Sequence, residues 1–254
     1  MRPNEVKRKL AAGGTVFGVF VGFGSPGLAE VFAYCGVDYI VIDAEHGALD
    51  PHDVEGMTRA VEAAGATPFV RVPANDPRIL LRYLDVGTQG VMVPWCQSAA
   101  EAAAAVQATK YHPEGTRGLA SVRAARYGVG MALPEYVKVA NAETMVIAQV
   151  ETVATLEALP EMLQVPGVDV FFIGPNDLSQ SLGYPARPDE PAVREVIDRI
   201  LAQIIAAGKV AGIMTRDGAS ARRYREQGVR FISINATSLI APAARGFLQT
   251  ATAS

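Results

Sequence analysis

The sequence has 254 residues, of which 50% are hydrophobic, and a net charge of −3 without long runs of one sign. A chain of this length can bury one large core, and its charge offers no basic face for nucleic acid or anionic lipid. The polar N-terminus lacks a signal-peptide pattern and no apolar run could span a bilayer, so we expect a cytoplasmic protein without nucleic-acid or membrane partners.

One unit of sequence recurs along the chain: a helical segment ends at a glycine, and a short run rich in Val, Ile or Phe follows. Four junctions are close to one phrase, namely CGVDYIVID, VGTQGVMVP, PGVDVFFIG and QGVRFISIN. Glycine commonly ends helices, and β-branched or aromatic residues favour strands. We predict strands over 15–21, 37–42, 68–72, 90–94, 145–150, 168–173, 210–214 and 231–235. Their alternation with helices predicts an α/β protein, a single-domain (β/α)8 TIM barrel over residues 1–254.

The first predicted strand is followed by Gly22 to Gly27, which match the pattern G-x-G-x-x-G, and the second strand ends near Asp43. This is the fingerprint of a dinucleotide-binding fold, so a nicotinamide-dependent oxidoreductase remains an alternative. Ser25 and Pro26, however, form an ordinary pair of N-cap and first helical residue. We therefore favour a simple turn between strand and helix.

Three ionisable residues follow the second predicted strand, in the stretch VIDAEHG: Asp43, Glu45 and His46. Barrel enzymes place their catalytic groups at the C-terminal ends of strands. Asp43 and Glu45 share one face of an extended segment, and His46 begins the loop, free to point over the barrel mouth. The alternative is that Asp43 caps the next helix and His46 is solvated. The charge density at this rim favours a catalytic role for Asp43 and His46.

Arg71 lies inside the apolar third strand, PFVRVP. A buried arginine needs a carboxylate or phosphate partner. It can form a structural ion pair with Asp43 or Glu45, clamp an anionic substrate, or do both in turn.

Residues 111–130 are out of step with the repeat, because they are too long for an ordinary connection. Long loops in compact domains tend to be functional. For the three arginines of this segment we slightly favour solvated loop charge over ligand contact; they are Arg117, Arg123 and Arg126.

The fifth predicted strand ends in Gln149-Val150-Glu151. The two-residue period of a strand places Gln149 and Glu151 on one face. If that face is the barrel interior, Glu151 lies at the top of the core and Gln149 supports it.

The sixth predicted strand ends at Gly174-Pro175, a turn dipeptide that delivers Asn176 and Asp177 just past the strand, ahead of a short helical turn at 178–183. Asp177 can be a helix N-cap or a site residue. Because Glu151 precedes it on the neighbouring strand, two carboxylates meet there and repel unless they share a proton or a cation. We expect Mg²⁺ or Mn²⁺, with Co²⁺ as a third candidate.

Two other kinds of site are disfavoured. No His and Cys set has the spacing of a zinc site, and the two cysteines lack redox spacing. Schiff-base catalysis needs a lysine at the strand ends, and none of the five lysines ends a strand: Lys7, Lys9, Lys110, Lys138 and Lys209.

In this order and spacing, VIDAEHG, PFVRVP, LDVGTQGVMVP, QVET and FIGPNDLSQSLGYP resemble the HpcH/HpaI aldolase family over nearly the whole chain. That family comprises metal-dependent class II aldolases, such as those for 4-hydroxy-2-oxoheptanedioate and 2-dehydro-3-deoxyglucarate, which release pyruvate from 4-hydroxy-2-oxo acids or 2-dehydro-3-deoxy sugar acids. The resemblance implies a homohexamer of (β/α)8 barrels. It also implies that Glu151 and Asp177 bind the metal, that His46 is the catalytic base and that Arg71 stabilises the enolate.

The resemblance further implies a set of residues that contact substrate: Gln149, Asn176, Asp177 and Arg71. Asp85, in LDVGTQ, matches the acid that raises the basicity of the catalytic histidine. Our prediction places Asp85 at a helix end before the fourth strand, on the opposite rim from His46. In the family role it would therefore act on a neighbouring subunit; the alternative is a helix-end acid without a catalytic part.

We therefore expect a class II aldolase that cleaves a 4-hydroxy-2-oxo acid or a 2-dehydro-3-deoxy sugar acid to pyruvate and an aldehyde. The alternative is a related lyase, acting on a CoA thioester of a hydroxy acid or decarboxylating oxaloacetate. The family often has a longer loop with arginine and serine after EGTRG than LASVRAARYG, so the resemblance does not carry over the identity of the aldehyde.

Overall fold

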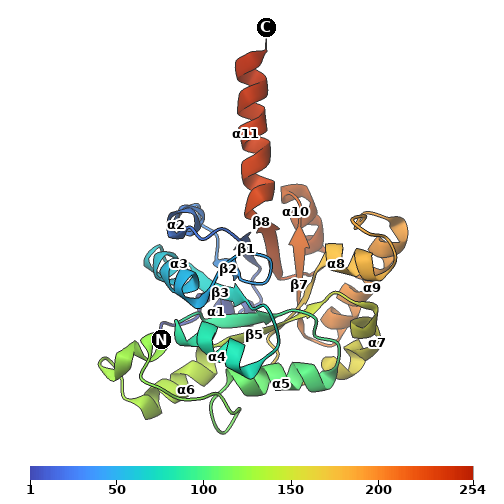
Figure 1. The fold of residues 1–254 in the computed structure, drawn as a ribbon. Coiled ribbons are helices and arrows are strands. Elements are labelled where there is room, and N and C mark those ends of the chain that lie inside the picture. The colour runs from blue at the N-terminus through green and yellow to red at the C-terminus, as the bar shows by residue number, and fades with distance from the viewer. Residues whose placement is uncertain (254) are drawn as a thin grey trace.

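The computed structural model describes residues 1–253, which form a closed barrel of parallel strands paired in sequence order, with β8 returning to β1 (Figure 1). The strands are β1 Val16–Val21, β2 Tyr39–Asp43, β3 Thr67–Arg71, β4 Gly90–Val93, β5 Met145–Val150, β6 Val170–Ile173, β7 Val210–Thr215 and β8 Phe231–Asn235. Each of the eight strands begins and ends within two residues of its predicted bounds. The predicted barrel is therefore confirmed.

Helices join the strands, and their first residues follow a capping pattern. The helices are α1 Glu5–Ala11, α2 Pro26–Tyr34, α3 Pro51–Ala63, α4 Pro77–Asp85, α5 Ala99–Thr109, the 3-10 helix η1 Arg123–Gly128, α6 Leu133–Glu143, α7 Val153–Met162, α8 Pro175–Ser181, α9 Pro191–Ala206, α10 Gly218–Glu226 and α11 Ala236–Thr252. Ser25, Asp50 and Asp76 cap α2, α3 and α4, each directly before a proline. Ser25 thus has the capping role expected of it, and a closed barrel is not the doubly wound sheet of a dinucleotide fold.

Aromatic rings fill the barrel interior, where Tyr39 stacks on Phe231 with ring centroids 4.2 Å apart. Gly18, on the neighbouring strand, makes room for this pair, since a Cβ there would lie 2.1 Å from the Tyr39 ring. Phe20 and Phe172 pack farther along the same interior. The barrel is therefore a packed core, and chemistry is confined to its mouth.

The helix α8 begins three residues earlier than predicted, at Pro175 rather than residue 178. Proline is favoured at the first helical position, and Gly183, with φ of +84°, follows the helix end. Gly174 is the N-cap, so Asp177 lies inside the first turn and does not cap the helix. The interpretation of Asp177 as an N-cap is wrong.

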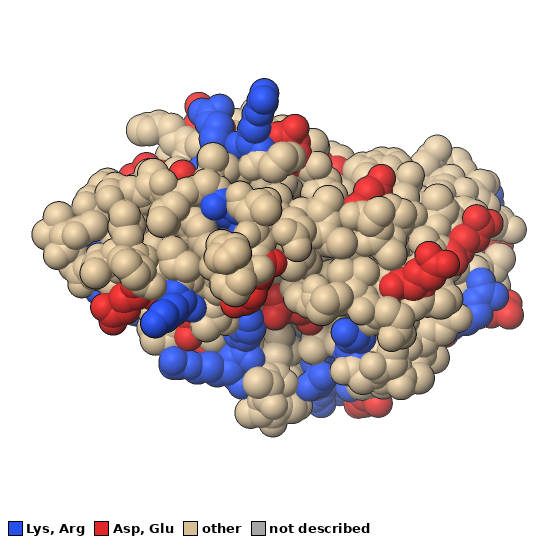
Figure 2. Space-filling view, turned by 90° about the horizontal axis from the view of Figure 1, so that it is seen from below, with Lys and Arg blue, Asp and Glu red and all other residues tan. Residues whose placement is uncertain are grey.

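The last helix, α11, stands away from the barrel as a rod (Figure 1). Ala236 is its buried residue, whereas four large apolar side chains are exposed: Leu239, Ile240, Phe247 and Leu248. Neither α11 nor any other helix within residues 1–253 has the length and hydropathy of a membrane span. On the face seen in Figure 2, acidic and basic side chains are interspersed among wide neutral areas.

Candidate active site

A cavity of about 310 Å³ opens at the C-terminal ends of the strands. Its lining brings together most of the residues predicted from separate segments, namely His46, Arg71, Gln149, Asn176 and Asp177. They come from the ends of β2, β3, β5 and β6, where barrel enzymes carry their chemistry. The sequence prediction of one shared rim for these residues therefore agrees with the structure.

Asp43 and Arg71 face each other at the ends of β2 and β3, where they are register partners. Arg71 donates from Nε to Asp43 Oδ1 at 2.9 Å and from Nη2 to Asp43 Oδ2 at 2.6 Å. Its Nη1 lies 3.2 Å from Glu45 Oε2, and all three side chains are largely buried. Burial opposes the charge of Arg71, but the hydrogen bonds and charge of Asp43 outweigh it and raise the arginine's pKa. The structural ion pair anticipated for Arg71 is thus present.

Asp43 also shapes the loop that carries His46. Its Oδ1 accepts hydrogen bonds from the backbone N–H groups of Glu45 at 3.2 Å and His46 at 3.3 Å. The next helix is capped by Asp50 instead, so the interpretation of Asp43 as a helix cap is wrong. Asp43 holds both the guanidinium of Arg71 and the turn before His46.

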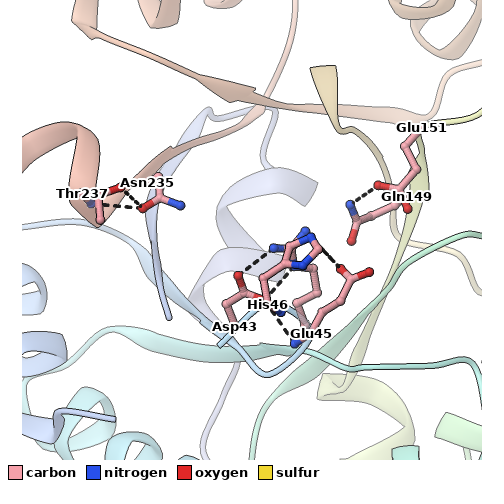
Figure 3. Close-up of polar contacts among 8 residues, drawn as sticks. Asp43, Glu45, His46, Gln149, Glu151, Asn235 and Thr237 are labelled. Carbon is pink, nitrogen blue, oxygen red and sulfur yellow. Dashed lines mark hydrogen bonds and ion pairs between the residues drawn. The ribbon is translucent and has the colours of Figure 1, made fainter. Parts of the chain in front are cut away.

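His46 is the accessible group of this cluster, with 63% of its side chain exposed. Its Nε2 lies 4.0 Å from Glu45 Oε2. Burial raises the pKa of Glu45, although the charge of Arg71 acts in the opposite direction. In Figure 3 the imidazole stands over Asp43 and Glu45, between Asn235 on one side and Gln149 with Glu151 on the other. The imidazole of His46 is therefore accessible to a molecule in the cavity.

Glu151 is a buried carboxylate, 1% exposed, held from two sides. The amide of Gln149 donates to its Oε2 at 2.6 Å, and the backbone N–H of Trp95 donates to its Oε1 at 2.7 Å. A Cβ at Gly174 would lie 2.9 Å from Oε2, so the glycine leaves room beside the carboxylate. Gln149 and Glu151 share one face, as the strand period predicted (Figure 3).

The charge state of Glu151 reflects its surroundings. Burial, together with the negative charges of Asp177 and Glu45, raises its pKa to about 7, although the Trp95 N–H acts in the opposite direction. A buried carboxylate beside a second one fits a divalent cation, since a cation would relieve the repulsion. Within residues 1–253 no cluster of three or more His, Cys, Asp or Glu side chains has metal-site geometry, so water or substrate oxygens would complete the coordination.

Asp85 is the predicted site residue that lies apart from the others. It is the last residue of α4, immediately ahead of the turn into β4, so it lies at the rim opposite the cavity. Its Oδ1 accepts a hydrogen bond of 2.8 Å from Arg117 Nη2. The structure therefore does not bring Asp85 together with His46 within one protomer.

The arginines of residues 111–130 are less solvated than expected. The side chain of Arg117 is fully buried against Asp85 and over the ring of Tyr111, and its Nε and Nη1 have no hydrogen-bond partner among the described residues. Arg123 donates to Glu62 and to the carbonyl oxygen of Val86. The expectation of solvated charge is wrong for these two, because both are paired beneath the loop.

Sequence reasoning missed several groups at the site. Trp95 supplies its backbone N–H from a left-handed conformation, φ 52°, that a bulky residue rarely adopts and that no sequence pattern predicts. Arg216 and Asp189 line the cavity and form an ion pair. Arg216 directly follows β7, so the rule used for the second and sixth strands would have found it.

Comparison with known proteins found similar sequences and structures over nearly the whole chain. The family model for HpcH/HpaI aldolase/citrate lyase matches residues 16–242. The 4-hydroxy-2-oxo-heptane-1,7-dioate aldolase of Shigella sonnei is 39% identical over 244 residues, 95% of this chain and 92% of that protein. The hydroxypyruvate/pyruvate aldolase of Roseovarius nubinhibens is 37% identical over 233 residues, 91% and 90% of the two chains. A crystal structure of a protein of the same family from Burkholderia cenocepacia J2315 is 37% identical, with a TM-score of 0.93 over 98% of this chain and 100% of that one.

Proposed function

Because this chain belongs to the HpcH/HpaI aldolase/citrate lyase family, we propose that it is a metal-dependent class II aldolase that releases pyruvate. The enzyme is a carbon–carbon lyase of the aldolase type. Its proposed substrate is a 4-hydroxy-2-oxo acid or a 2-dehydro-3-deoxy sugar acid, and its products are pyruvate and an aldehyde. The observation that carries this proposal is the buried carboxylate of Glu151, which feels the charge of Asp177, a residue that lines the cavity together with His46 and Arg71.

Glu151 and Asp177 are the residues that would hold the cation. When bound, Mg²⁺ or Mn²⁺ would supply Lewis acidity at a 2-oxo acid. The protein's part is to present carboxylates at two neighbouring strand ends, of which that of Glu151 is oriented by the hydrogen bonds from Gln149 and Trp95. The pKa of Glu151 is raised first by burial and then by the negative charges of Asp177 and Glu45, and this unfavourable charge is the physical support for the assignment.

His46 is the proposed base for the hydroxyl proton at C4 of the substrate. Its exposure at the cavity and the loop bonds to Asp43 give it access and orientation. As the C3–C4 bond breaks, negative charge grows on the pyruvate fragment. Arg71, prepositioned by Asp43, is the cation that this chain offers to the developing enolate. Backbone N–H groups of Asn176 and Asp177, in the first turn of α8, lack intrahelical partners and suit a carboxylate.

We also propose that the protein works as a homo-oligomer, expected to be a hexamer, in which Asp85 reaches a neighbouring active site. The position of Asp85 at the opposite rim supports action across an interface. The buried donors of Arg117 that lack partners lie at the same place. The exposed apolar residues of α11 give a second reason to expect association with another copy.

The second candidate function is a lyase that uses the same enolate chemistry on another substrate. The family description itself includes citrate lyase, so cleavage of a CoA thioester or decarboxylation of oxaloacetate remains open. The third candidate function is nicotinamide-dependent oxidation with Gly22 to Gly27 as the dinucleotide-binding loop. Ser25 caps α2 and Pro26 is its first residue, which favours an ordinary turn over such a loop.

One experiment separates these functions: a coupled assay of pyruvate release over 4-hydroxy-2-oxo acids and sugar acids, with oxaloacetate and a hydroxyacyl-CoA included and the metal varied. We expect aldol cleavage that EDTA abolishes and Mg²⁺ or Mn²⁺ restores. Full activity in excess EDTA would contradict the metal role. Turnover of oxaloacetate or CoA thioester alone would favour the second candidate, and tight NADH binding seen by fluorescence would favour the third.

A further inference from the structure

The active-site cavity extends beyond the catalytic residues to a second polar region, which we call the distal end. It is formed by residues at and after the ends of β6, β7 and β8, namely Asp189, Arg216, Arg223, Asn235 and Ser238. The catalytic residues lie at the ends of β2, β3, β5 and β6. Because the barrel is closed with its strands in sequence order, the end of β7 lies across the mouth from the end of β3, which carries Arg71. A substrate anchored at one side therefore points its far end at the other.

The guanidinium of Arg216 can exchange its present carboxylate partner for an anionic group of a ligand. It forms an ion pair with Oδ2 of Asp189, while Oδ1 of the same carboxylate accepts a hydrogen bond of 2.9 Å from Arg194. Asp189 therefore keeps one arginine when the other moves away. Arg216 is 61% exposed and directly follows β7, so little packing opposes such a movement.

Arg223 is a second cation at the distal end, on α10. Within residues 1–253 it forms no ion pair, and its guanidinium lies over the ring of Tyr224, 4.7 Å from the centroid. Asn235 directs its Oδ1 to Thr237 at 3.0 and 2.8 Å, which leaves the amide Nδ2 as a donor without a protein partner among the described residues. Figure 3 shows this amide on the opposite side of His46 from Glu151.

The charge of the distal end is positive. Arg216 and Arg223 contribute two positive charges. The negative charge of Asp189 is shared with Arg194, which forms an ion pair with it but lies outside the cavity lining. Guanidinium groups bind carboxylate and phosphate oxygens through paired N–H donors. In (β/α)8 barrels the loops after the seventh and eighth strands commonly bind phosphate. Here Arg216 directly follows β7, and Asn235 is the last residue of β8.

We propose that Arg216 and Arg223 form an anion subsite that recognises a terminal carboxylate or phosphate on the aldehyde half of the substrate. This inference rests on the proposed aldolase function, since the pyruvate half is assigned to the end with Arg71 and Asp177. The remaining space is small, because the whole cavity of about 310 Å³ is at the lower limit for ligand sites. The aldehyde is therefore short and carries a negative charge at the end away from the carbonyl.

The test is aldol addition of pyruvate to two matched pairs of aldehydes. Succinic semialdehyde is compared with butanal, and glyceraldehyde 3-phosphate with glyceraldehyde, by kcat/KM for the aldehyde. We expect the wild-type enzyme to prefer the charged member of at least one pair by roughly tenfold or more. Which pair has the larger ratio identifies carboxylate or phosphate as the recognised group.

Substitution then locates the preference. Arg216→Gln and Arg223→Gln should each lower the ratio of charged to neutral aldehyde by about tenfold, and Arg223→Lys should recover part of it. Arg222→Gln is the matched control, because Arg222 lies on the same helix but outside the cavity lining. The ratio is the readout that a merely structural role of these arginines would leave unchanged.

Hydrogen exchange at C3 of pyruvate in D₂O, measured without aldehyde, separates this inference from the proposed function. Exchange by the wild-type enzyme without a preference for charged aldehydes overturns the subsite alone. An equal fall for charged and neutral aldehydes in both glutamine variants overturns it as well. Absence of exchange and of all aldol addition contradicts the aldolase function, and the subsite with it.

Discussion

The side-chain amide of Gln149 donates a hydrogen bond of 2.6 Å to Oε2 of Glu151, two residues farther along the chain. Both side chains are 1% exposed, so water cannot replace this bond. The amide fixes the orientation of the carboxylate that we assign to the metal, and the Trp95 N–H fixes its other oxygen. A cation bound here would meet a ligand that is already oriented.

Replacement of Gln149 by Leu should therefore weaken metal binding without removing a ligand. Loss of a group that orients a metal ligand typically lowers affinity by about 10- to 100-fold. Isothermal titration calorimetry of the metal-free protein with Mn²⁺ measures the change in affinity. Glu151→Gln, which removes the ligand itself, should abolish binding in the same titration. Equal Mn²⁺ affinity of Gln149→Leu and the wild type would contradict an orienting role for the amide.

The raised pKa of Glu151 predicts how stability changes with pH when no cation is bound. The pKa of Glu151 is about 7 in the folded protein, whereas its ordinary value is 4.5. Between pH 4.5 and 7 the carboxyl group is therefore protonated in the folded protein and ionised in the unfolded chain. That proton stabilises the fold fully below pH 4.5, and the stabilisation is lost as the pH rises through 7. The loss amounts to roughly 3 kcal/mol.

Urea unfolding in EDTA at several pH values measures this effect. The free energy of unfolding of the wild type should fall with rising pH relative to Glu151→Gln, which cannot titrate at this position. Mg²⁺ added at pH 8 should restore stability to the wild type but not to the variant, because only an ionised carboxylate binds it. Parallel pH curves for the two proteins would show that Glu151 does not titrate near pH 7.

Much of the fold could be predicted because its signals are local. The strand β8 and the strand β5 match their predicted bounds, since each is a run of β-branched or aromatic residues at a point where a helix ends. The site residues that directly end a strand, such as Arg71, were placed by the same rule. Asp177 was assigned to the correct rim even though its helix begins earlier than expected.

Contacts between distant segments could not be predicted in the same way. Arg71 pairs with both Asp43 and Glu45, and this arrangement depends on the register between β2 and β3, which the sequence pattern of one strand does not determine. The ion pair of Arg216 and Asp189 joins two loops that are distant in the sequence, and no helical or strand periodicity predicts their contact. The left-handed conformation of Trp95 depends on tertiary structure that overrides local preference.

Arg71→Leu should destabilise the protein strongly, because it leaves Asp43 buried without its partner. Breaking a buried ion pair costs about 3 to 5 kcal/mol. Arg59→Leu is the matched control, since Arg59 pairs with Glu55 on the exposed face of α3 and its loss should cost about 1 kcal/mol or less. Urea unfolding compares the two variants, and equal destabilisation would contradict the role of burial.

Arg71→Lys separates charge from geometry at the same position. Lysine keeps the positive charge but cannot form the paired bonds that the guanidinium makes to Asp43. We expect kcat/KM for aldol cleavage to fall by roughly 10²- to 10³-fold, because the stabilising cation is no longer held in place. A lysine variant with full activity would show that a charge alone is sufficient.

His46→Ala should separate two reactions that share the pyruvate enolate. Aldol cleavage needs a base for the C4 hydroxyl, whereas oxaloacetate loses carbon dioxide without removal of a hydroxyl proton. We expect aldol cleavage to fall by about 10²- to 10⁴-fold while oxaloacetate decarboxylation persists. The two rates, measured on the same preparation, make the comparison independent of folding. Equal loss of both reactions would assign His46 to binding or structure rather than to proton transfer.

The proposed action of Asp85 across an interface predicts that two inactive variants restore each other. In a mixed oligomer, a subunit with Asp85→Ala still offers His46, and a neighbour with His46→Ala still offers Asp85. Random assembly of equal amounts should restore about a quarter of the sites, because each site needs one intact group from each of two subunits. Coexpression with two different affinity tags isolates the mixed oligomers, and their aldol cleavage rate is compared with that of each variant alone. No recovery in oligomers shown by mass spectrometry to contain both chains would mean that Asp85 serves only its own subunit, where its partner in the structure is Arg117.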